Sequence, residues 1–323
     1  MYYTDEQIEK YSKPLSDSEK RSCESTISVF ETILQKYGFS VTRKNFDEMD
    51  FEDLNHRFHV KKDNLVFTIF LQGSFGNGTC VRQDSDVDIA MICESHFRVK
   101  YPYNKSASDY KFKSSNFDII AFKDEFCKLI RSLNTEYKVE SHDKCIFFEG
   151  NGSSRKDMDI VPSLRYRDYS NDSDSDPDPD NYIGGVLIKT KKGEEIINYP
   201  EQSRLNSIQK NKATAYYYKK IVRILKNIKN DMIEKGVVGA DKVSSYGLEC
   251  MIYNVPNSFF NSYNGYYSLK KITYNVVDYL CKNTYTFSNF KETNGILNIF
   301  DNINNNNQVY ELLLLKIKTY LEI

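Results

Sequence analysis

Residues 73–88 read Gly-Ser-Phe-Gly-Asn-Gly-Thr-Cys-Val-Arg-Gln-Asp-Ser-Asp-Val-Asp. A Gly-Ser turn is followed, after a gap of eleven residues, by Asp86 and Asp88, and the apolar residues 89–92 come next. If residues 85–92 form a strand, alternate side chains share one face, so both carboxylates project from the same side. Backbone amides of a small, flexible turn can approach a phosphate. A phosphate-binding turn beside paired carboxylates indicates metal-dependent nucleotidyl transfer.

The composition is that of an ordinary globular chain with room for one large or two medium domains. The 323 residues are 40% hydrophobic and 28% charged, and the formal net charge is −1. A charge near zero provides no bulk attraction for nucleic acids or anionic membranes. The first residues lack the basic and apolar regions of a signal peptide, and no apolar run approaches membrane-spanning length. We therefore expect a cytoplasmic protein without a membrane partner.

The cysteines support the same compartment. Seven cysteines and four histidines are scattered along the chain, no CxxC pattern occurs, and His142 and Cys145 form an isolated pair. Neither a disulfide framework nor a structural zinc site is expected from this distribution, which is typical of a reducing cytoplasm.

The periodicity of apolar residues divides the chain into two parts. The N-terminal part contains a helix at residues 18–36, which Ser16 or Ser18 caps and Gly38 ends, and a second helix at residues 122–133. Its strands are expected at residues 66–71, 85–92, 144–148 and 158–164, with a hairpin formed by residues 186–188 and 195–197. Helical patterns then occupy residues 213–235, 244–254, 269–282 and 308–321. We predict an α+β fold in which residues 1–205 form the catalytic core and residues 206–323 form a helical substrate-binding lobe, with the active site in the cleft between them.

A third carboxylate is needed to complete a two-metal site. Residues 156–162 read Lys-Asp-Met-Asp-Ile-Val-Pro, and Asp159 stands between Met158 and Ile160, as expected for a carboxylate on a buried strand. Asp157 lies two residues earlier on the same face and is the competing candidate, which we rank second because it is nearer the start of the strand.

The Gly-Ser turn, the Asp-x-Asp pair and the distant aspartate resemble the DNA polymerase β-type nucleotidyltransferase superfamily. More narrowly, the chain is similar to the bacterial cGAS/DncV-like nucleotidyltransferases, and its later blocks are most similar to the CdnE-like branch. The resemblance covers roughly residues 60–260. The motifs that carry it are Gln72-Gly73-Ser74, Ser85-Asp86-Val87-Asp88, Asp159-Ile160-Val161-Pro162, Arg165-Tyr166-Arg167, Ile197-Asn198-Tyr199-Pro200, Lys210-Asn211-Lys212, Tyr218-Lys219, Val222-Arg223-Ile224-Leu225-Lys226, Ser244-Ser245-Tyr246-Gly247-Leu248-Glu249 and Tyr253-Asn254-Val255-Pro256-Asn257.

The resemblance implies a polymerase β-like core with a mixed sheet and a cyclic dinucleotide synthase of bacterial anti-phage defence. By the same resemblance, Asp86, Asp88 and Asp159 are catalytic and hold two Mg²⁺ ions, for which Mn²⁺ can substitute. Two nucleoside triphosphates are the substrates, and a downstream effector protein binds the product. We expect a monomer.

The resemblance also implies the substrate contacts. Gly73 and Ser74 match the turn that holds the phosphates, and Lys226 matches a phosphate contact in the animal enzymes. Ser245 and Tyr246 match residues that bind phosphate and stack on a base. Stacking on an aromatic face tolerates any base, so Tyr246 is expected to fix the position of the base more than its identity.

Basic residues recur near Lys226 at helical spacing. Lys212, Lys219, Arg223 and Lys226 are spaced seven, four and three residues apart, so on an α-helix they fall on one stripe. Two interpretations remain open: a solvated face of an amphipathic helix, and a surface that holds the triphosphate.

Two other functions share parts of this pattern. A template-independent nucleotidyltransferase that acts on an RNA end or a small acceptor has the same core, whereas a nucleotide-binding module with an inactive site is disfavoured because all three carboxylates are present. The animal members sense DNA with a zinc-bearing insertion. No His/Cys cluster of that kind occurs in this sequence, so activation by DNA is not expected.

Overall fold

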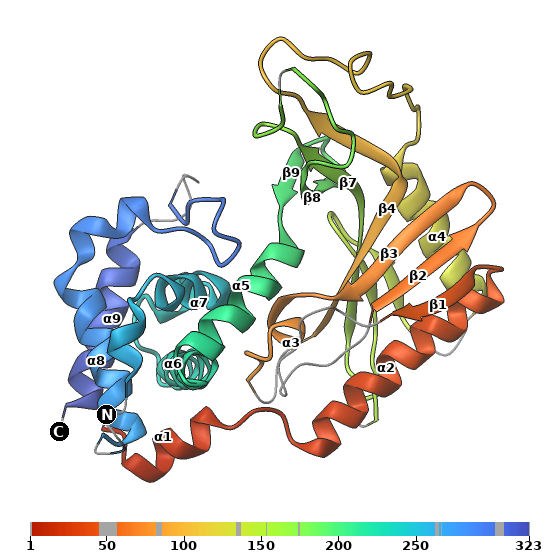
Figure 1. Ribbon diagram of the computed structural model, residues 1–323. Helices are drawn as coiled ribbons and strands as arrows, with labels where there is room; N and C mark the ends of the chain where they lie inside the picture. The colour runs from red at the N-terminus through yellow and green to blue at the C-terminus, as the bar shows by residue number, and fades with distance from the viewer. Residues whose placement is uncertain are drawn as a thin grey trace.

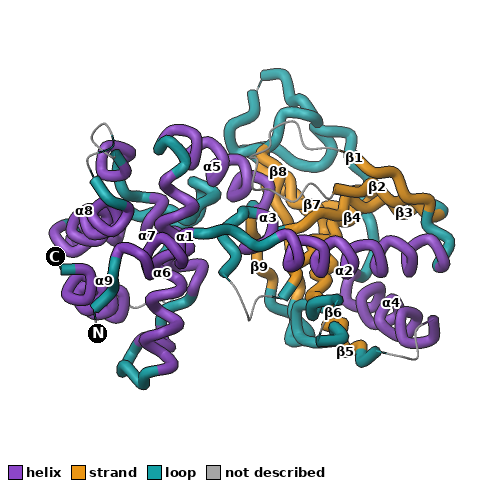
Figure 2. The backbone as a smooth tube through the Cα atoms, turned by 90° about the horizontal axis from the view of Figure 1, so that it is seen from below, coloured by secondary structure: helices purple, strands orange, loops and turns teal. Residues whose placement is uncertain are grey.

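The computed structural model describes residues 2–44, 57–81, 86–133, 137–152, 154–173, 175–261, 265, 267–300 and 307–322. In these residues a lobe built on a β-sheet stands beside a lobe built of helices, and α5 leads from one to the other (Figure 1). The same division is visible from below, where the strands and most helices occupy opposite ends (Figure 2). The predicted α+β fold with a mixed sheet is confirmed.

The described strands form one sheet in the order β1-β2-β3-β4-β7-β6-β5, and β8 pairs with β7 and with β9. Most neighbours are antiparallel, but the central strands β4 and β7 run parallel. The strands are β1 Ser40–Lys44, β2 Arg57–Lys62, β3 Leu65–Leu71, β4 Val87–Lys100, β5 Val139–Ser141, β6 Ile146–Phe148, β7 Met158–Asp168, β8 Ile183–Lys189 and β9 Glu195–Asn198.

Two helices cover one face of this sheet. They are α2 (Asp17–Lys36) and α4 (Ile119–Leu133), which both contribute to the main core of the lobe. The predicted ends of α2 are confirmed: Ser16 forms a capping box with Glu19, and Gly38 follows the helix with a φ of 90°.

Strand alternation decides which side chains reach that core. In β4, Val87, Ile89 and Met91 pack beneath α2 and α4, whereas Ala90 and Ile92 belong to a small cluster on the opposite face. Asp88 shares the face of Ala90 and Ile92, because side chains two residues apart point the same way. The carboxylate therefore lies on the face that the two helices leave open.

The helical lobe contains α5 (Pro200–Ala213), α6 (Tyr217–Glu234), α7 (Ser245–Tyr253), α8 (Leu269–Lys282), α9 (Asn307–Leu321) and three short 3₁₀ helices, Ala240–Lys242, Asn257–Phe260 and Thr284–Asn289. The helix predicted for residues 213–235 is confirmed as α6, but it starts four residues later than we predicted. The chain leaves the helical conformation after Ala213, passes through left-handed φ values of 48° at Ala215 and 65° at Tyr216, and starts α6 at Tyr217. Residues 214–216 contain no glycine or proline, so no ordinary helix-breaking residue marks this turn.

The N-terminal helix α1 (Asp5–Ser12) belongs spatially to the helical lobe. Tyr3 and Ile8 are part of its apolar core, and the hydroxyls of Tyr3 and Tyr11 donate to the Asp231 carboxylate of α6 at 3.0 and 2.5 Å. The boundary that we predict between residues 205 and 206 falls inside α5. The helical lobe thus also includes the N-terminal helix α1, and the chain passes between the lobes within α5. No described helix has the length and apolar character needed to cross a membrane.

A buried arginine fastens α5 to the sheet. Arg165 on β7 donates to Glu94 at 2.9 and 2.6 Å and to Glu201 of α5 at 2.6 Å, and only 6% of its side chain is exposed. Arg57 on β2 also contacts Glu201, at 3.3 Å. Since this network joins three strands to the first turn of α5, it sets the direction in which the helical lobe leaves the sheet.

We predict that Arg165→Met lowers the free energy of unfolding by about 3–5 kcal/mol, because it leaves two carboxylates without their shared cation in a half-buried place. Urea unfolding followed by circular dichroism measures the change. Arg43→Met is the matched control. The Arg43 side chain pairs with Glu31 but is 63% exposed, so its loss should cost no more than about 1 kcal/mol. Equal losses in both variants would contradict the structural role of Arg165.

Candidate active site

The parallel pairing of β4 with β7 brings two predicted site residues together. Asp88 and Asp159 stand directly opposite each other in the register, so their side chains leave the sheet on the same face. Asp157 precedes β7, and its carboxylate accepts a hydrogen bond from the Gly150 amide at 2.7 Å. The register therefore brings Asp159, our first-ranked candidate for the third carboxylate, next to Asp88.

Asp86 lies outside the strand on which we expected it. The strand expected from residue 85 begins only at Val87, so Asp86 lies just before β4 and is exposed, while Ser85 falls outside the described residues. The prediction that both aspartates project from one strand is therefore wrong, because Asp86 lies outside β4. Asp86 is nevertheless near enough to contribute to the electrostatic environment of Asp88.

The electrostatics of Asp88 reveal a site with excess negative charge. Burial, then the charge of Asp159 and then that of Asp86 raise the pKa of Asp88 from 3.8 to about 7. Like charges held close together disfavour ionisation unless a cation neutralises them. Carboxylate oxygens are also the ligands that hard divalent cations prefer. A divalent cation bound beside Asp88 would therefore relieve this repulsion.

The Gly-Ser turn packs against the same carboxylate. Gly73 opens the four-residue helix α3 (Gly73–Gly76) with a φ of 63°, which favours glycine. A Cβ atom at Gly73 would collide with the Asp88 carboxylate, and its distance to Asp88 Cγ would be 3.2 Å. A backbone hydrogen bond also joins the turn to β4, because the Gln72 amide donates to the Asp88 carbonyl at 2.9 Å. Glycine is thus required for both the turn and the close approach.

A cleft of about 390 Å³ lies where the two lobes meet. It brings together Gly73, Ser74 and Asp88 from the sheet lobe with Lys226, Ser245 and Tyr246 from the helical lobe. Asp86 and Asp159 are not among the residues that line it. Its lining is Gln72, Gly73, Ser74, Asn77, Asp88, Lys144, Val161, Ile188, Asn198, Pro200, Ser203, Lys226, Ser245, Tyr246 and Glu249.

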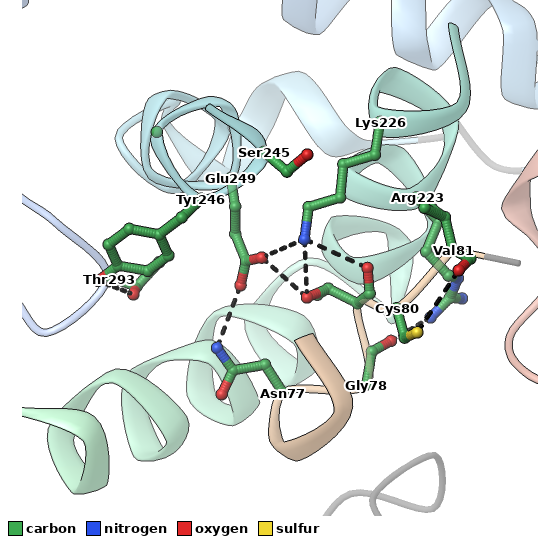
Figure 3. Close-up of polar contacts among 12 residues, drawn as sticks. Asn77, Gly78, Cys80, Val81, Arg223, Lys226, Ser245, Tyr246, Glu249 and Thr293 are labelled. Atoms are coloured by element: carbon green, nitrogen blue, oxygen red, sulfur yellow. Dashed lines mark hydrogen bonds and ion pairs between the residues drawn. The ribbon is translucent and has the colours of Figure 1, made fainter. Parts of the chain in front are cut away.

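Lys226 lines the cleft but is held by protein partners (Figure 3). Its Nζ donates to Glu249 of α7 at 2.6 Å and to Thr79 Oγ1 at 3.2 Å, and its side chain is 4% exposed. Glu249 in turn accepts from Thr79 at 2.8 Å and from Asn77 at 3.2 Å. Because Asn77 and Thr79 follow the Gly-Ser turn, this network ties the turn to the helical lobe.

The basic stripe that we expected does not exist as one surface. Lys212 is exposed on α5, whereas Lys219 and Arg223 are fully buried on α6. Arg223 donates to the Gly78 carbonyl at 2.6 Å and to the Ser12 carbonyl at 2.7 Å. It therefore connects the end of α1 with the segment behind the Gly-Ser turn. The interpretation as a solvated helix face is wrong for these buried residues, because backbone carbonyls from distant segments surround Arg223.

Ser245 and Tyr246 lie at the start of α7, on the wall of the cleft. Ser245 Oγ accepts a hydrogen bond from Lys229 at 2.7 Å. The Tyr246 hydroxyl contacts Glu292 at 3.1 Å and Thr293 at 3.3 Å, while 38% of the residue stays exposed. Anchoring the hydroxyl orients the ring, and the exposed part of the residue remains available to a flat ligand.

Several residues that line the cleft were not predicted from the sequence. Lys144 comes from the segment before β6, Asn77 from the end of α3, and Ser203 from α5. None belongs to a recognisable spacing pattern. Glu249 was part of a motif, but its pairing with Lys226 depends on how α6 and α7 pack and has no signal in the sequence.

We predict that the metal-free protein becomes less stable as the pH rises from about 4 to 7. The raised pKa of Asp88 means that the folded state binds more protons than the unfolded state in this interval, so the free energy of unfolding falls with increasing pH. An upper limit of about 4 kcal/mol follows from the shift, and solvent screening reduces it. Asp88→Asn should remove this pH dependence and raise the Tm at pH 8 but not at pH 4, as measured in EDTA by thermal unfolding. A Tm gain of the same size at both pH values would contradict it.

We also predict that Lys226→Met destabilises the fold by about 3–5 kcal/mol, because it leaves Glu249 charged and buried. The double variant Lys226→Met/Glu249→Gln should recover a large part of this loss. Urea unfolding of both single variants and the double variant measures the coupling energy. Additive losses in the double variant would show that the two side chains do not stabilise each other.

Comparisons with known proteins agree with this geometry. Residues 205–322 match the model of the cGAS/DncV-like nucleotidyltransferase C-terminal helical domain. The cyclic GMP-AMP synthase CdnE03 of Staphylococcus schleiferi is 40% identical over 100% of this chain and 98% of its own length.

Two solved structures are similar over nearly their whole length. The Elizabethkingia meningoseptica CdnE cyclic dinucleotide synthase, solved with GTP and Apcpp, has a TM-score of 0.72 at 26% identity and covers 99% of this chain and 100% of its own. The Rhodothermus marinus CdnE c-UMP-AMP synthase has a TM-score of 0.77 at 23% identity, covers 98% of this chain and 97% of its own, and supports the fold. The chain therefore belongs to the CdnE branch of the cGAS/DncV-like nucleotidyltransferases.

Proposed function

We propose that this chain joins two nucleoside triphosphates, with release of pyrophosphate, and cyclises the linear intermediate into a cyclic dinucleotide. The observation that carries the proposal is the register that sets Asp88 beside Asp159, next to the Gly73 turn and at the edge of a cleft. The relatives support the reaction class, because the Staphylococcus protein is named a cyclic GMP-AMP synthase and the Elizabethkingia structure contains GTP and Apcpp.

The arrangement fits a pair of Mg²⁺ ions, which Mn²⁺ could replace. Asp86, Asp88 and Asp159 would hold them, because carboxylate oxygens are the ligands that hard cations prefer and because the charges of Asp159 and Asp86, together with burial, raise the pKa of Asp88. When bound, such ions activate a ribose hydroxyl and neutralise the charge of the leaving pyrophosphate. The contribution of the protein is to hold three carboxylates in place before the substrate arrives.

The remaining residues position the nucleotides. The amides of Gly73 and Ser74 face the phosphates, because the missing Cβ of Gly73 lets the backbone lie against Asp88. On the opposite wall, Ser245 would offer a hydroxyl, and Lys226 would contact a phosphate only if its ammonium turned away from Glu249. The Tyr246 ring, oriented by Glu292 and Thr293, offers a surface on which a base can stack.

We further propose that the enzyme acts in the bacterial cytoplasm as a monomer and that a separate effector protein reads its product in anti-phage defence. Its seven cysteines remain thiols, which suits a reducing compartment. Residues 1–205 would act as the catalytic core and residues 206–323 as the substrate-binding lobe, with α5 crossing between them.

Replacing any one of Asp86, Asp88 or Asp159 by asparagine should abolish synthesis, because an amide is a poor ligand for a hard cation. The protein is incubated with all four NTPs and Mg²⁺, the remaining NTPs are removed with phosphatase, and mass spectrometry identifies the product and its bases. Asp157→Asn is the matched control: it removes a neighbouring carboxylate that accepts a hydrogen bond from the Gly150 amide, and the variant should retain most of the activity.

Two results would contradict the proposal. Linear tails or a labelled acceptor in place of a phosphatase-resistant dinucleotide would favour a template-independent nucleotidyltransferase. Unchanged synthesis by the Asp88→Asn variant would show that the Asp88 carboxylate is not needed for the reaction.

A further inference from the structure

A second group of metal ligands lies behind the proposed active site. His142, Cys145 and Asp159 each offer one ligand atom, and these three atoms lie within 4.8 Å of one another. The Cys145 thiol already donates to Asp159 Oδ1 at 3.2 Å. His142 is exposed and Cys145 half-buried, so an ion can reach them from solvent. Two ligands come from the turn between β5 and β6 and the third from β7.

The turn that carries His142 and Cys145 is held rigidly from two sides. Lys123 of α4, which is 2% exposed, donates to the carbonyls of His142 and Asp143 at 2.8 and 2.6 Å. From the other side the Lys191 amide donates to Asp143 Oδ1 at 2.8 Å. Figure 2 shows β5 and β6 beside α4. A buried lysine that is bonded to two carbonyls of one turn fixes the ligands before any ion binds.

The imidazole is oriented as well. His142 Nε2 lies 3.4 Å from a Glu140 carboxylate oxygen, and its ring stacks on Phe147 with the two planes 5° apart. A carboxylate behind a histidine is a common supporting contact in zinc sites, where it fixes the ring and raises its basicity.

We propose that His142, Cys145 and Asp159 form a site for a thiophilic divalent cation of the Zn²⁺ class. Zn²⁺ binds imidazole nitrogen, thiolate and carboxylate, and sites with three protein ligands leave a fourth position for water. Zinc–ligand bonds of about 2.0–2.3 Å place tetrahedral ligands about 3.5 Å apart, so the group has to contract by little more than about 1 Å. The Cys145 proton is released to solvent as the ion binds.

The site shares Asp159 with the proposed catalytic centre, and this consequence rests on the proposed function. An ion held by His142 and Cys145 engages the Asp159 carboxylate that the reaction needs for Mg²⁺. Mg²⁺ prefers oxygen ligands and does not compete for the thiol. Low concentrations of Zn²⁺ therefore inhibit synthesis even when Mg²⁺ is in large excess, and the cysteine makes the inhibition selective.

The test uses the full chain after treatment with EDTA. Titration with Co²⁺ should produce a thiolate-to-metal charge-transfer absorption in the near ultraviolet, and one equivalent of Zn²⁺ should remove it. Cys145→Ser should abolish the band, and His142→Ala should weaken Zn²⁺ binding at least about tenfold, as judged from the loss of ligand support at known sites. Cys281→Ser is the matched control, since Cys281 is another half-buried thiol, on α8, and should leave the band unchanged. Absence of the band in the wild-type protein, or its persistence in Cys145→Ser, would overturn the site.

The second measurement is the Zn²⁺ concentration that halves synthesis at fixed Mg²⁺, with each protein compared with its own rate without Zn²⁺. Cys145→Ser should need at least about tenfold more Zn²⁺ than wild type or Cys281→Ser. Equal inhibition of all three proteins by Zn²⁺ would contradict the proposal that the two sites share the Asp159 carboxylate. The two proposals fail separately: a cobalt band without synthesis from any NTP mixture refutes the synthase, and synthesis without the band refutes the cation site.

Discussion

The parallel register between β4 and β7 is the constraint on which the rest of the molecule depends. Every side chain on one face of these strands has a fixed neighbour, so Asp88 meets Asp159 while Ile89 and Ile160 enter the core beneath α2 and α4. A shift by one residue would exchange the two faces of a strand and place a carboxylate in the apolar core. The same apolar contacts that stabilise the lobe therefore hold the acidic residues in position, and the site needs no separate scaffold.

The second wall of the cleft depends on buried charge. Glu249 receives hydrogen bonds from Lys226, Asn77 and Thr79, so one carboxylate of α7 holds both the helical lobe and the segment that follows the Gly-Ser turn. Such pairs are costly to desolvate and are destabilising when broken. The raised pKa of Asp88 likewise reflects a buried charge with like charges beside it, an arrangement that is common at functional sites.

The local elements were largely predictable because their signals are local. The capping residue of α2, the strands β3 and β7, and the Gly73 turn all follow from nearby residues. The break between α5 and α6 was not predictable from the sequence. Residues 214–216 contain no glycine or proline, and tertiary packing stabilises the left-handed turn. The environments of Arg223 and Lys226 were not predictable either, because their partners come from residues more than 20 positions away in the chain. Asp159 was not recognised in the sequence as a third ligand for His142 and Cys145, because it reaches them through the pairing of β6 with β7.

The position of α1 has a consequence for how the chain folds during synthesis. Arg223 holds the Ser12 carbonyl, and Asp231 receives the hydroxyls of Tyr3 and Tyr11. Residues 3–12 must therefore wait for the middle of α6 to be synthesised before they can dock. At synthesis rates of about 5–20 residues per second, this delay is roughly 10–40 s. The sheet lobe can begin to fold in that time. The contacts of Arg223 with Ser12 and with Gly78, behind the Gly-Ser turn, form later. The contacts of α1 that support the cleft are thus completed only after α6 has been synthesised.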